Sequence, residues 1–365
     1  MKNLFVINTP YHLLTCFILT HSIFKQDDNY LALMHPHGYD KWQNSTLISY
    51  ISSIQCGYKN IFPLLQWLSS KNKTQSYKQQ AQYVKDNITP LNIENIFIAV
   101  DISPVNQLLV MAVEQNHFYR FEDGMYSYFN ENRRRKKSHA LFHKLKTYLL
   151  KFASGIHGNM YINTEAEGEN PAGLADYMYN PNLLRRKSPD IREITVSMIH
   201  EAISDLKNKN LLPKQFEQNS ILYLSQPMVE IGKFSLEEEA DCLKKITASL
   251  GENAVLYYKP HPHDNPDKLT YYKNNLKQLK IYEGIEPAEL LFVNNPKLKA
   301  VISYQSSALM NVDKFSNKQI KAISLSDIFQ TPIYPTYKEI MQQANVAFPK
   351  NIIEITSIIK NKQAF

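Results

Sequence analysis

The sequence predicts a two-domain α/β protein with parallel sheets, on the evidence of its strand and helix rhythm and its length. Short runs of β-branched and aromatic residues alternate with helical patterns, the order expected when crossover helices connect parallel strands. The chain has 365 residues, and at roughly 100 to 200 residues per domain this corresponds to two hydrophobic cores. The simplest architecture is two Rossmann-like domains facing each other across a cleft, with ligands at the carboxyl ends of the strands.

The first half of the chain shows this alternation clearly. The apolar run 4–7 predicts the first strand, and an amphipathic helix is expected over 11–24. Ser103 and Pro104 provide an N-cap and a proline in the first turn for a helix over 105–115. The same β-branched and aromatic signal predicts further strands at 30–34, 96–100 and 118–121.

The pattern changes after residue 131, where a basic stretch precedes a loop-rich region rich in Asn, Pro and Gly. We therefore expect an N-terminal domain at 1–155, a linker region at 156–195 and a C-terminal domain at 196–365. A capping box at 235–238 begins a helix that ends at Gly251. The C-terminal domain is expected to have strands at 221–224, 255–258, 280–282, 300–304 and 320–325, and further helices at 287–293, 306–315 and 337–344.

Composition excludes several classes of protein. The ten glycines fit neither a dinucleotide fingerprint nor a P-loop, and the three cysteines lack metal or disulfide spacing. The longest apolar run, 108–113, is far shorter than the roughly 18 to 20 residues that cross a bilayer. The first residues also lack the length and cleavage site of a secretory signal, so we expect a cytoplasmic protein.

Acidic residues follow the strand predicted at 118–121. Glu122, Asp123 and Gly124 would place a carboxylate on a tight turn at the carboxyl edge of the sheet, where a base can take a proton from a hydroxyl. An ordinary acidic turn is the alternative. This motif alone does not decide between them.

A second motif, Lys259-Pro260-His261-Pro262, follows another predicted strand. The two prolines restrict the backbone around His261, and a rigid His beside Lys259 suits a phosphate leaving group because both donate hydrogen bonds to negative charge. A surface turn is one alternative. A metal site at His261 and His263 is another, and it is disfavoured because a zinc site needs three or four ligands.

Two further motifs complete the set of candidates. Ser306 and Ser307 open a helix after the strand at 300–304, and hydroxyls with free N–H groups there can hold a phosphate. A plain N-cap explains them equally well. Glu289, in the first turn of another helix, can accept the hydroxyls of a ribose or simply complement the helix dipole.

Taken in order, these motifs and Tyr11-His12-Leu13-Leu14 after the first strand resemble the bacterial sialyltransferases, and most closely glycosyltransferase family 52, the lipooligosaccharide sialyltransferases. Those enzymes share an acid-acid-glycine, a His-Pro and a Ser-Ser motif on a GT-B fold. The resemblance implies that Asp123 is the general base and that His261 donates to the departing CMP phosphate. It further implies a set of donor-binding residues: Ser306 and Ser307 for the phosphate, Glu289 for the ribose, Lys259 and Pro262 for the cytosine, and Ser225 and Gln226 in a nucleotide-contacting loop.

The resemblance also implies an inverting transferase that moves sialic acid from CMP-Neu5Ac to a terminal galactose-type acceptor of lipooligosaccharide or a related surface glycan. CMP-Neu5Ac is the donor substrate, and neither a cofactor nor a metal is expected. The alternatives are a GT-B transferase with another donor, of UDP-sugar or CDP-glycerol type, an H-x-H metallohydrolase, and a scaffold that binds a sugar nucleotide without turning it over. The sequence leaves the oligomeric state open, with a homodimer among the options.

The net charge of +7 lies entirely in residues 131–151, which hold eight Lys and Arg and one Glu. Apolar residues recur behind these cations at helical spacing, which is typical of a basic amphipathic segment on an anionic membrane surface. We therefore expect peripheral contact with the inner face of the membrane. A solvated helix face is the alternative, and nucleic acid is disfavoured because the rest of the chain has no basic stripe.

Overall fold

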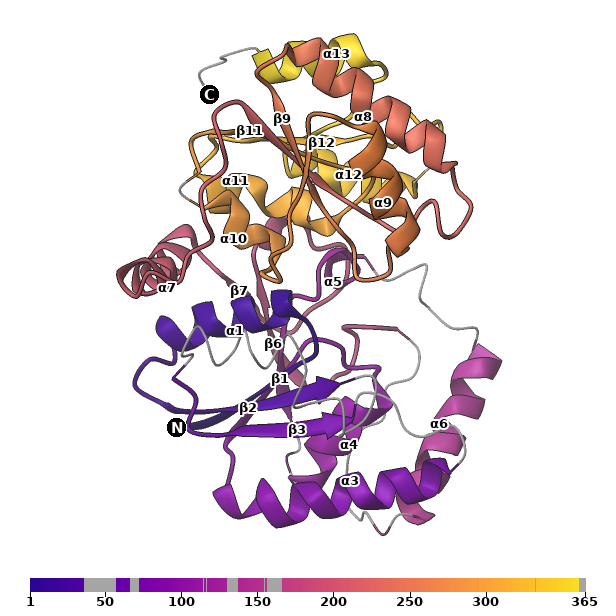
Figure 1. The fold of residues 1–365 in the computed structure, drawn as a ribbon. Helices are drawn as coiled ribbons and strands as arrows, with labels where there is room; N and C mark the ends of the chain where they lie inside the picture. The colour runs from indigo at the N-terminus through magenta and orange to yellow at the C-terminus, as the bar shows by residue number, and fades with distance from the viewer. Residues whose placement is uncertain are drawn as a thin grey trace. The chain divides into compact units, whose positions relative to one another are not determined.

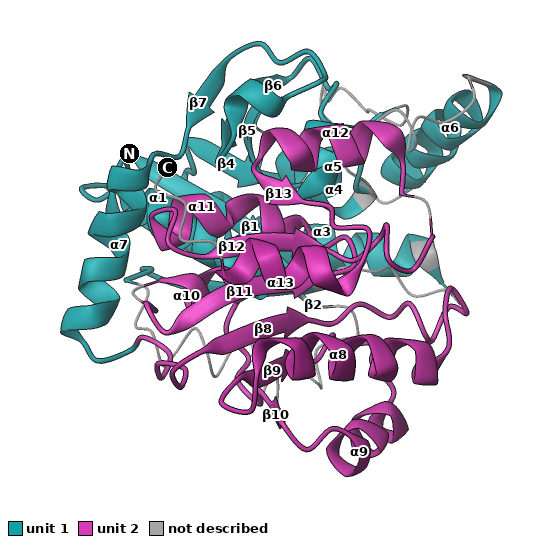
Figure 2. Ribbon diagram, turned by 90° about the horizontal axis from the view of Figure 1, so that it is seen from above, with its two compact units in different colours: residues 1–211 teal, residues 212–365 magenta. Residues whose placement is uncertain are grey.

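The protein is described from a computed structural model. The structure describes residues 1–35, 57–65, 72–113, 115, 117–129, 137–153, 155, 166–293, 295–331 and 333–360. These residues divide into two compact units, 1–211 and 212–365, shown in Figure 2 in teal and magenta. Each unit contains one parallel sheet with helices packed on it (Figure 1).

Unit 1 contains a seven-stranded sheet in the order β3-β2-β1-β4-β5-β6-β7, and every neighbouring pair is parallel. The first six strands follow the doubly wound Rossmann order, which reverses direction between β1 and β4. The strands are β1 (Lys2–Ile7), β2 (Asp28–His35), β3 (Ile61–Leu65), β4 (Asn95–Ile98), β5 (Phe118–Phe121), β6 (Gly173–Met178) and β7 (Ile191–Glu193).

The helices of unit 1 begin where the sequence supplies caps. Thr9 accepts a backbone hydrogen bond at the start of α1, and Ser103 accepts one at the start of α4. Each of these caps is followed by a proline in the first turn. The α-helices are α1 (Pro10–His21), α3 (Lys73–Asn87), α4 (Pro104–Ala112), α5 (Met125–Tyr128), α6 (Lys137–Ala153) and α7 (Val196–Asn208), with 3-10 helices η2 (Thr89–Leu91) and η4 (Pro181–Leu183).

Unit 2 repeats the same topology with six parallel strands in the order β10-β9-β8-β11-β12-β13. Renumbered from β8, this is again the order 3-2-1-4-5-6, so the sheet reverses between β8 and β11. The strands are β8 (Ser220–Leu224), β9 (Val255–Lys259), β10 (Leu279–Ile281), β11 (Leu298–Ser303), β12 (Lys321–Ser324) and β13 (Val346–Ala347).

Helix α8 shows how the sequence sets a helix start in unit 2. Ser235 accepts from the Glu238 N–H, and the Glu238 side chain accepts from the Ser235 N–H, so the expected capping box is present. The helices are α8 (Leu236–Leu250), α9 (Pro266–Asn275), α10 (Ala288–Phe292), α11 (Val312–Ser316), α12 (Pro335–Gln343) and α13 (Ile352–Lys360), with the 3-10 helix η5 (Ser307–Asn311).

The division between the units falls later than the sequence suggested. The segment expected as a linker, 156–195, contributes β6 and β7 to the sheet of unit 1. Helix α7, expected in the C-terminal domain, belongs to unit 1, where it packs on α1 and Asp205 lies 3.5 Å from His21. The loop-like composition of 156–195 therefore conceals sheet-forming residues.

The segment expected to be basic and amphipathic, 131–151, is described only in part. Residues 131–136, with Arg133, Arg134, Arg135 and Lys136, lie outside the described residues. The rest of the segment forms most of α6. In the described part of the chain, no helix is long and apolar enough to cross a membrane.

Candidate functional site

In unit 1 the candidate residues follow β1 and β5, at the carboxyl edge of the sheet. Thr9 caps α1 by accepting the His12 N–H at 3.1 Å, which fixes His12 in the first turn of the helix. Glu122, Asp123 and Gly124 follow β5 directly. Gly124 has φ 95°, a backbone conformation that favours glycine, and this sharp turn leads into α5.

Glu122 is a buried anchor of this turn. Its side chain is 1% exposed and accepts hydrogen bonds from the Tyr11 hydroxyl at 2.8 Å, the Tyr179 N–H at 2.9 Å and the Tyr128 hydroxyl. Burial beside this carboxylate raises the pKa of Tyr128 well above its usual value. The first acid of the motif therefore ties α1, α5 and the segment after β6 together.

Asp123 is the accessible acid of the pair. His12 Nε2 donates to Asp123 Oδ1 at 2.6 Å, and His12 is 2% exposed whereas the Asp123 side chain is 21% exposed. The Asp123 N–H also donates to the Ser127 hydroxyl at 2.7 Å, which holds the backbone of the turn. Among the described residues nothing donates to Asp123 Oδ2. A carboxylate with one oxygen oriented by a buried imidazole and the other open has the arrangement of a general base.

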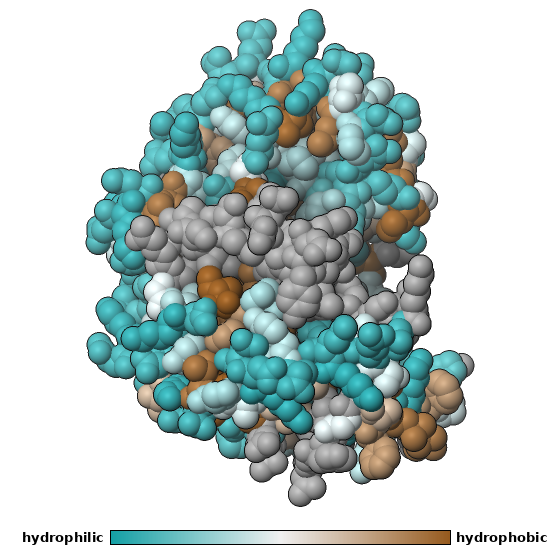
Figure 3. Space-filling view, turned by 60° about the horizontal axis from the view of Figure 1, so that its bottom comes forward, coloured by the Kyte–Doolittle hydropathy of each residue, from teal (hydrophilic) through white to brown (hydrophobic). Residues whose placement is uncertain are grey.

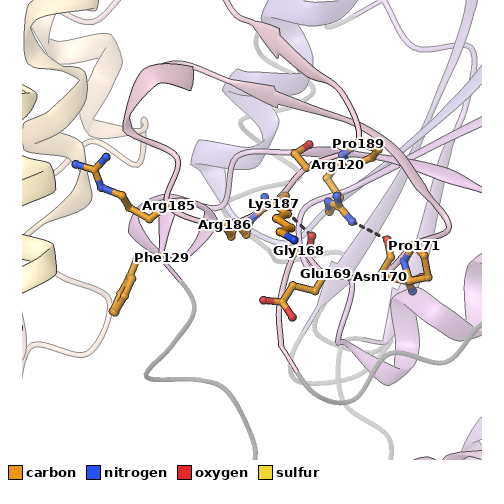
Figure 4. Close-up of a pocket in the computed structure, with 11 residues that line it drawn as sticks. Arg120, Phe129, Gly168, Glu169, Asn170, Pro171, Arg185, Arg186, Lys187 and Pro189 are labelled. Carbon is orange, nitrogen blue, oxygen red and sulfur yellow. Dashed lines mark hydrogen bonds between the residues drawn. The ribbon is translucent and has the colours of Figure 1, made fainter.

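A cavity of about 1070 Å³ opens in the same unit. In Figure 4, Arg185 and Phe129 lie at one end of it, Lys187 and Glu169 in the middle, and Arg120 beyond them. The other lining residues are Gly168, Asn170, Pro171, Arg186, Ser188 and Pro189. The lining therefore contains four basic side chains and one acidic side chain.

A buried ion network connects this cavity to the Asp123 turn. Arg120 donates to Asp176 at 2.5 Å and to Asp101 at 3.1 Å, and Arg186 donates to Asp176 at 2.8 Å. Arg186 also donates through Nε to the Ser127 carbonyl at 2.8 Å. Burial by itself raises the pKa of Asp176, but the charges and hydrogen bonds of these two arginines outweigh burial, so the pKa of Asp176 is lowered. Arg186, which lines the cavity, therefore also holds the backbone of Ser127, the residue whose hydroxyl accepts the Asp123 N–H.

In unit 2 the candidate residues lie at the point where the strand order reverses. Ser225 and Gln226 follow β8, and Gln305, Ser306 and Ser307 follow β11. Gln226 Oε1 accepts the Gln305 N–H at 2.8 Å, which connects the two loops across the reversal point. Ligands of doubly wound sheets bind at this position.

The His-Pro turn after β9 holds His261 in a defined orientation. The backbone N–H of His261 donates to Asp264 Oδ2 at 3.0 Å, and the ring Nδ1 of His261 accepts the backbone N–H of His263 at 3.2 Å. Because Nδ1 is an acceptor, the neutral ring carries its proton on Nε2. Burial lowers the pKa of His261, with Asp264 opposing the shift. The ring therefore offers an N–H donor at Nε2 near neutral pH.

Asp264 is the centre of a buried network beneath this turn. It accepts from the Ser225 hydroxyl at 2.9 Å and from the Tyr258 hydroxyl at 2.9 Å. The ammonium of Lys268 lies 3.4 Å from Asp264 and 3.0 Å from Glu239, and Lys268 is buried. The hydroxyl of Ser225 is therefore engaged inside the protein, and its expected contact with a nucleotide stays a prediction.

Lys259 and Glu289 lie on neighbouring segments. The Lys259 ammonium donates to the Gly284 carbonyl at 2.9 Å and lies 5.0 Å from the Tyr282 ring centre. Burial lowers the pKa of Lys259, and the charges of Glu286 and Glu289 oppose the shift. The cytosine and ribose contacts expected of Lys259 and Glu289 stay predictions.

The Ser-Ser motif lies at the start of η5. Ser306 is its N-cap and accepts the Ala308 N–H at 3.3 Å. Asn311, on the same 3-10 helix as Ser307, donates to the buried Glu289 at 3.5 Å. Pro262 is exposed on the His-Pro turn. All seven donor-site candidates and His261 thus lie at or after the carboxyl ends of β8, β9, β10 and β11.

The resemblance drew attention to Tyr11 and His12 without giving either residue a role. The structure shows that His12 orients Asp123. Asp264 and Lys268 were not among the candidates, although Asp264 stands in the same turn as His261 and that proximity was a usable signal. In the described part of the chain no group of three or more His, Cys, Asp and Glu side chains is arranged to hold a metal ion.

The strand orders and the placement of these residues define the class of protein: two Rossmann-like units of the GT-B fold. A proposed UDP-N-acetylglucosamine 2-epimerase from Listeria monocytogenes superposes with a TM-score of 0.58 at 14% identity, over 99% of this chain and 88% of that one. The UDP-GlcNAc 2-epimerase of Methanocaldococcus jannaschii gives 0.57 at 10% identity, over 100% and 94%. The spinosyn forosaminyltransferase SpnP gives 0.53 at 8% identity, over 99% and 91%.

The chain belongs to the alpha-2,8-polysialyltransferase family, whose sequence profile matches residues 3–325. The resemblance to bacterial sialyltransferases is thereby confirmed, while the narrower resemblance to glycosyltransferase family 52 stays a prediction. No curated protein matches the sequence significantly.

Proposed function

We propose that the protein is an inverting, metal-independent sialyltransferase that uses CMP-sialic acid as its donor. The observation that carries this proposal is the Asp123–His12 pair, in which one carboxylate oxygen is held at 2.6 Å and the other is open. Membership of a sialyltransferase family supports the reaction class. In this proposal unit 1 supplies the base and unit 2 binds the donor.

The residues of unit 2 have the chemistry that a CMP-sugar requires. The N–H at Nε2 of His261 donates to the phosphate, and Ser306 and Ser307 offer hydroxyls to the same group. Glu289 accepts from the ribose hydroxyls, and Gln226 fixes the loop that carries the serines. Lys259 and Pro262 border the cytosine, and Ser225 supports the His-Pro turn from below.

The reaction proceeds as a single displacement. The acceptor hydroxyl transfers its proton to Asp123 while its oxygen forms a bond to the anomeric carbon of sialic acid. The bond from that carbon to the phosphate oxygen breaks, and CMP leaves with the electron pair. His261 stabilises the negative charge on the departing phosphate, and the geometry of the bound reactants lowers the barrier.

The acceptor is the finer part of the proposal. Family membership favours an acceptor that itself ends in sialic acid. The new sialic acid would then be joined to that terminal residue through an alpha-2,8 linkage. Arg185 and Lys187, which line the cavity of unit 1, suit a carboxylate-bearing sugar of this kind. The galactose-type terminus of a lipooligosaccharide is the second candidate, favoured by the ordered sequence motifs.

Donor and acceptor screening tests the proposal. The chain is incubated with CMP-Neu5Ac and either a sialyl-terminated or a galactose-terminated lactoside, with and without EDTA, and the products are separated by mass. Sialyl transfer that persists in EDTA supports the proposal, and the productive acceptor decides between the two candidates. Transfer only from a UDP-sugar or CDP-glycerol, or loss of transfer in EDTA, contradicts it.

A further inference from the structure

Helix α6 presents an apolar stripe to solvent. Its members are 57–70% exposed, and their spacing places them on one face of the helix. The stripe consists of Leu141, Phe142, Leu145, Tyr148, Leu149 and Phe152. In Figure 3, brown and tan side chains gather at the lower right, the side on which α6 lies in Figure 1. Contiguous exposed apolar surface on one helix is unusual for a surface in contact only with water.

The opposite face of α6 is already packed on its own unit. Ala140 is buried, and Leu150 packs against the cluster of Tyr77, Ala81, Leu108 and Met111. The helix therefore has a core contact that holds it in place, and the apolar stripe is a second face. For the stripe to pack on this core, α6 would have to rotate and lose the present contacts of Ala140 and Leu150.

Cations border the stripe on both sides. At about 100° per residue the stripe is about 120° wide, and Lys144 and Lys146 each lie about 40° beyond one of its edges. Both lysines are exposed. Lys151, on the same flank as Lys144, places its ammonium 5.5 Å from the Tyr148 ring centre. The sequence of α6 contains no Asp or Glu.

We propose that α6 is an in-plane anchor that lies on an anionic lipid surface with this stripe in the interface. Apolar and aromatic side chains on one face, with lysines along both borders, are the composition of helices that lie in the headgroup region. Anionic headgroups would neutralise the bordering lysines. A second copy of the chain is the weaker occupant, because two such helices would bring like-charged lysines together and the sequence of α6 contains no Asp or Glu.

Vesicle flotation tests the anchor. The full chain is mixed with vesicles of phosphatidylcholine alone or of phosphatidylcholine with an equal part of phosphatidylglycerol. We expect binding to the second and much weaker binding to the first. The double variant Leu145→Ser with Leu149→Ser should lose binding by about a hundredfold. The double variant Lys144→Glu with Lys146→Glu should abolish the preference for the anionic vesicles.

Matched controls distinguish vesicle binding through the stripe of α6 from nonspecific adhesion of the protein to vesicles. Ile353→Ser and Ile231→Ser remove exposed apolar side chains elsewhere, 81% and 59% exposed, and should leave vesicle binding unchanged. Circular dichroism melting should show that all variants are folded, because the substituted side chains lie in solvent. Sialyl transfer to a lactoside free in solution should persist in the stripe variant, so failure of the anchor and failure of the proposed activity are distinguishable.

Three results would overturn the anchor. The first is an absence of flotation of the unsubstituted chain with anionic vesicles. The second is equal flotation of the stripe variant and the unsubstituted chain. The third is a change in oligomeric state: the unsubstituted chain is a dimer on gel filtration without vesicles, the stripe variant is a monomer, and both float equally with vesicles. The stripe would then be an interface between copies of the chain.

Discussion

The two adjacent acids after β5 should respond in opposite ways to the same chemical change. Asp123→Asn and Glu122→Gln each replace a carboxylate by an amide of the same shape. Asp123 is partly exposed and bonded on one side-chain oxygen, whereas Glu122 is buried and accepts from two tyrosine hydroxyls and a backbone N–H. We expect Asp123→Asn to remove activity with little change in stability, and Glu122→Gln to destabilise unit 1.

The structure gives the magnitudes. Glu122→Gln replaces one accepting oxygen by an NH2 group that cannot accept, so at least one of the three bonds described above is lost and the others lose the negative charge. At about 1 kcal/mol for each affected bond, the cost is about 3 kcal/mol. For a unit of this size that corresponds to a fall of about 6–12 °C in the melting temperature. Asp123→Asn retains an oxygen for His12 and should cost under about 1 kcal/mol. Loss of a general base should lower kcat by about 10² to 10⁴.

Two assays on each variant decide the outcome. Thermal unfolding followed by circular dichroism gives the stability, and product formation from CMP-Neu5Ac gives kcat, with CMP binding by calorimetry as the check on the donor site. The interpretation of the turn fails if Asp123→Asn keeps most of its turnover. It also fails if Asp123→Asn destabilises the protein more than Glu122→Gln does.

Three further predictions concern other parts of the two units. Burial lowers the pKa of His261 below its ordinary value of 6.5, so the unfolded chain takes up this proton first, and the contribution of His261 to stability should be constant above pH 6.5 and fall below it. His261→Asn should reduce the fall in stability in urea titrations at several pH values; the half-buried His21, whose pKa is also lowered, accounts for part of what remains. Asp264→Asn should weaken CMP binding about tenfold or more by releasing the His-Pro turn, while the exposed Asp267→Asn should not; equal effects would count against this role. Arg120→Ala should destabilise the protein by about 3–5 kcal/mol because the buried Asp101 and Asp176 lose the guanidinium that they share, and Asp176 keeps only Arg186, whereas Arg192→Ala, at an exposed pair, should cost under about 1 kcal/mol by denaturant unfolding.

Much of the fold was predictable because local and global preferences agree. The strand β8 is fully buried, and its residues 221–224 form an uninterrupted apolar run. The capping box of α8 forms as its four residues suggest. Strand β6 was missed because Asp176 and Gly173 are poor strand residues in isolation. Asp176 is tolerated inside the sheet because Arg120 pairs with it across 56 residues of sequence, a partnership that no local pattern shows.

The sequence predicted where the candidate site residues lie in the fold better than it predicted which side chains they contact. The strand signal placed Asp123 and His261 at strand ends, which the structure confirms. The pairing of His12 with Asp123 joins residues 111 apart, and a single sequence carries no information about such a contact. The internal engagement of Ser225 was equally hidden, because a hydroxyl after a strand is compatible with either a ligand or a buried carboxylate.

The position of Pro63 in β3 has a consequence for behaviour in concentrated solution. Among the described residues β3 is an outermost strand of its sheet, so within that part of the chain one side of its backbone has no neighbouring strand. Leu31 donates to the Asn60 carbonyl, and alternation along the strand turns the Pro63 nitrogen toward the free side. Proline has no N–H there, so another extended chain finds a gap in the row of donors at this edge. The strand is thus protected against edge-to-edge aggregation by a residue that the sheet itself tolerates.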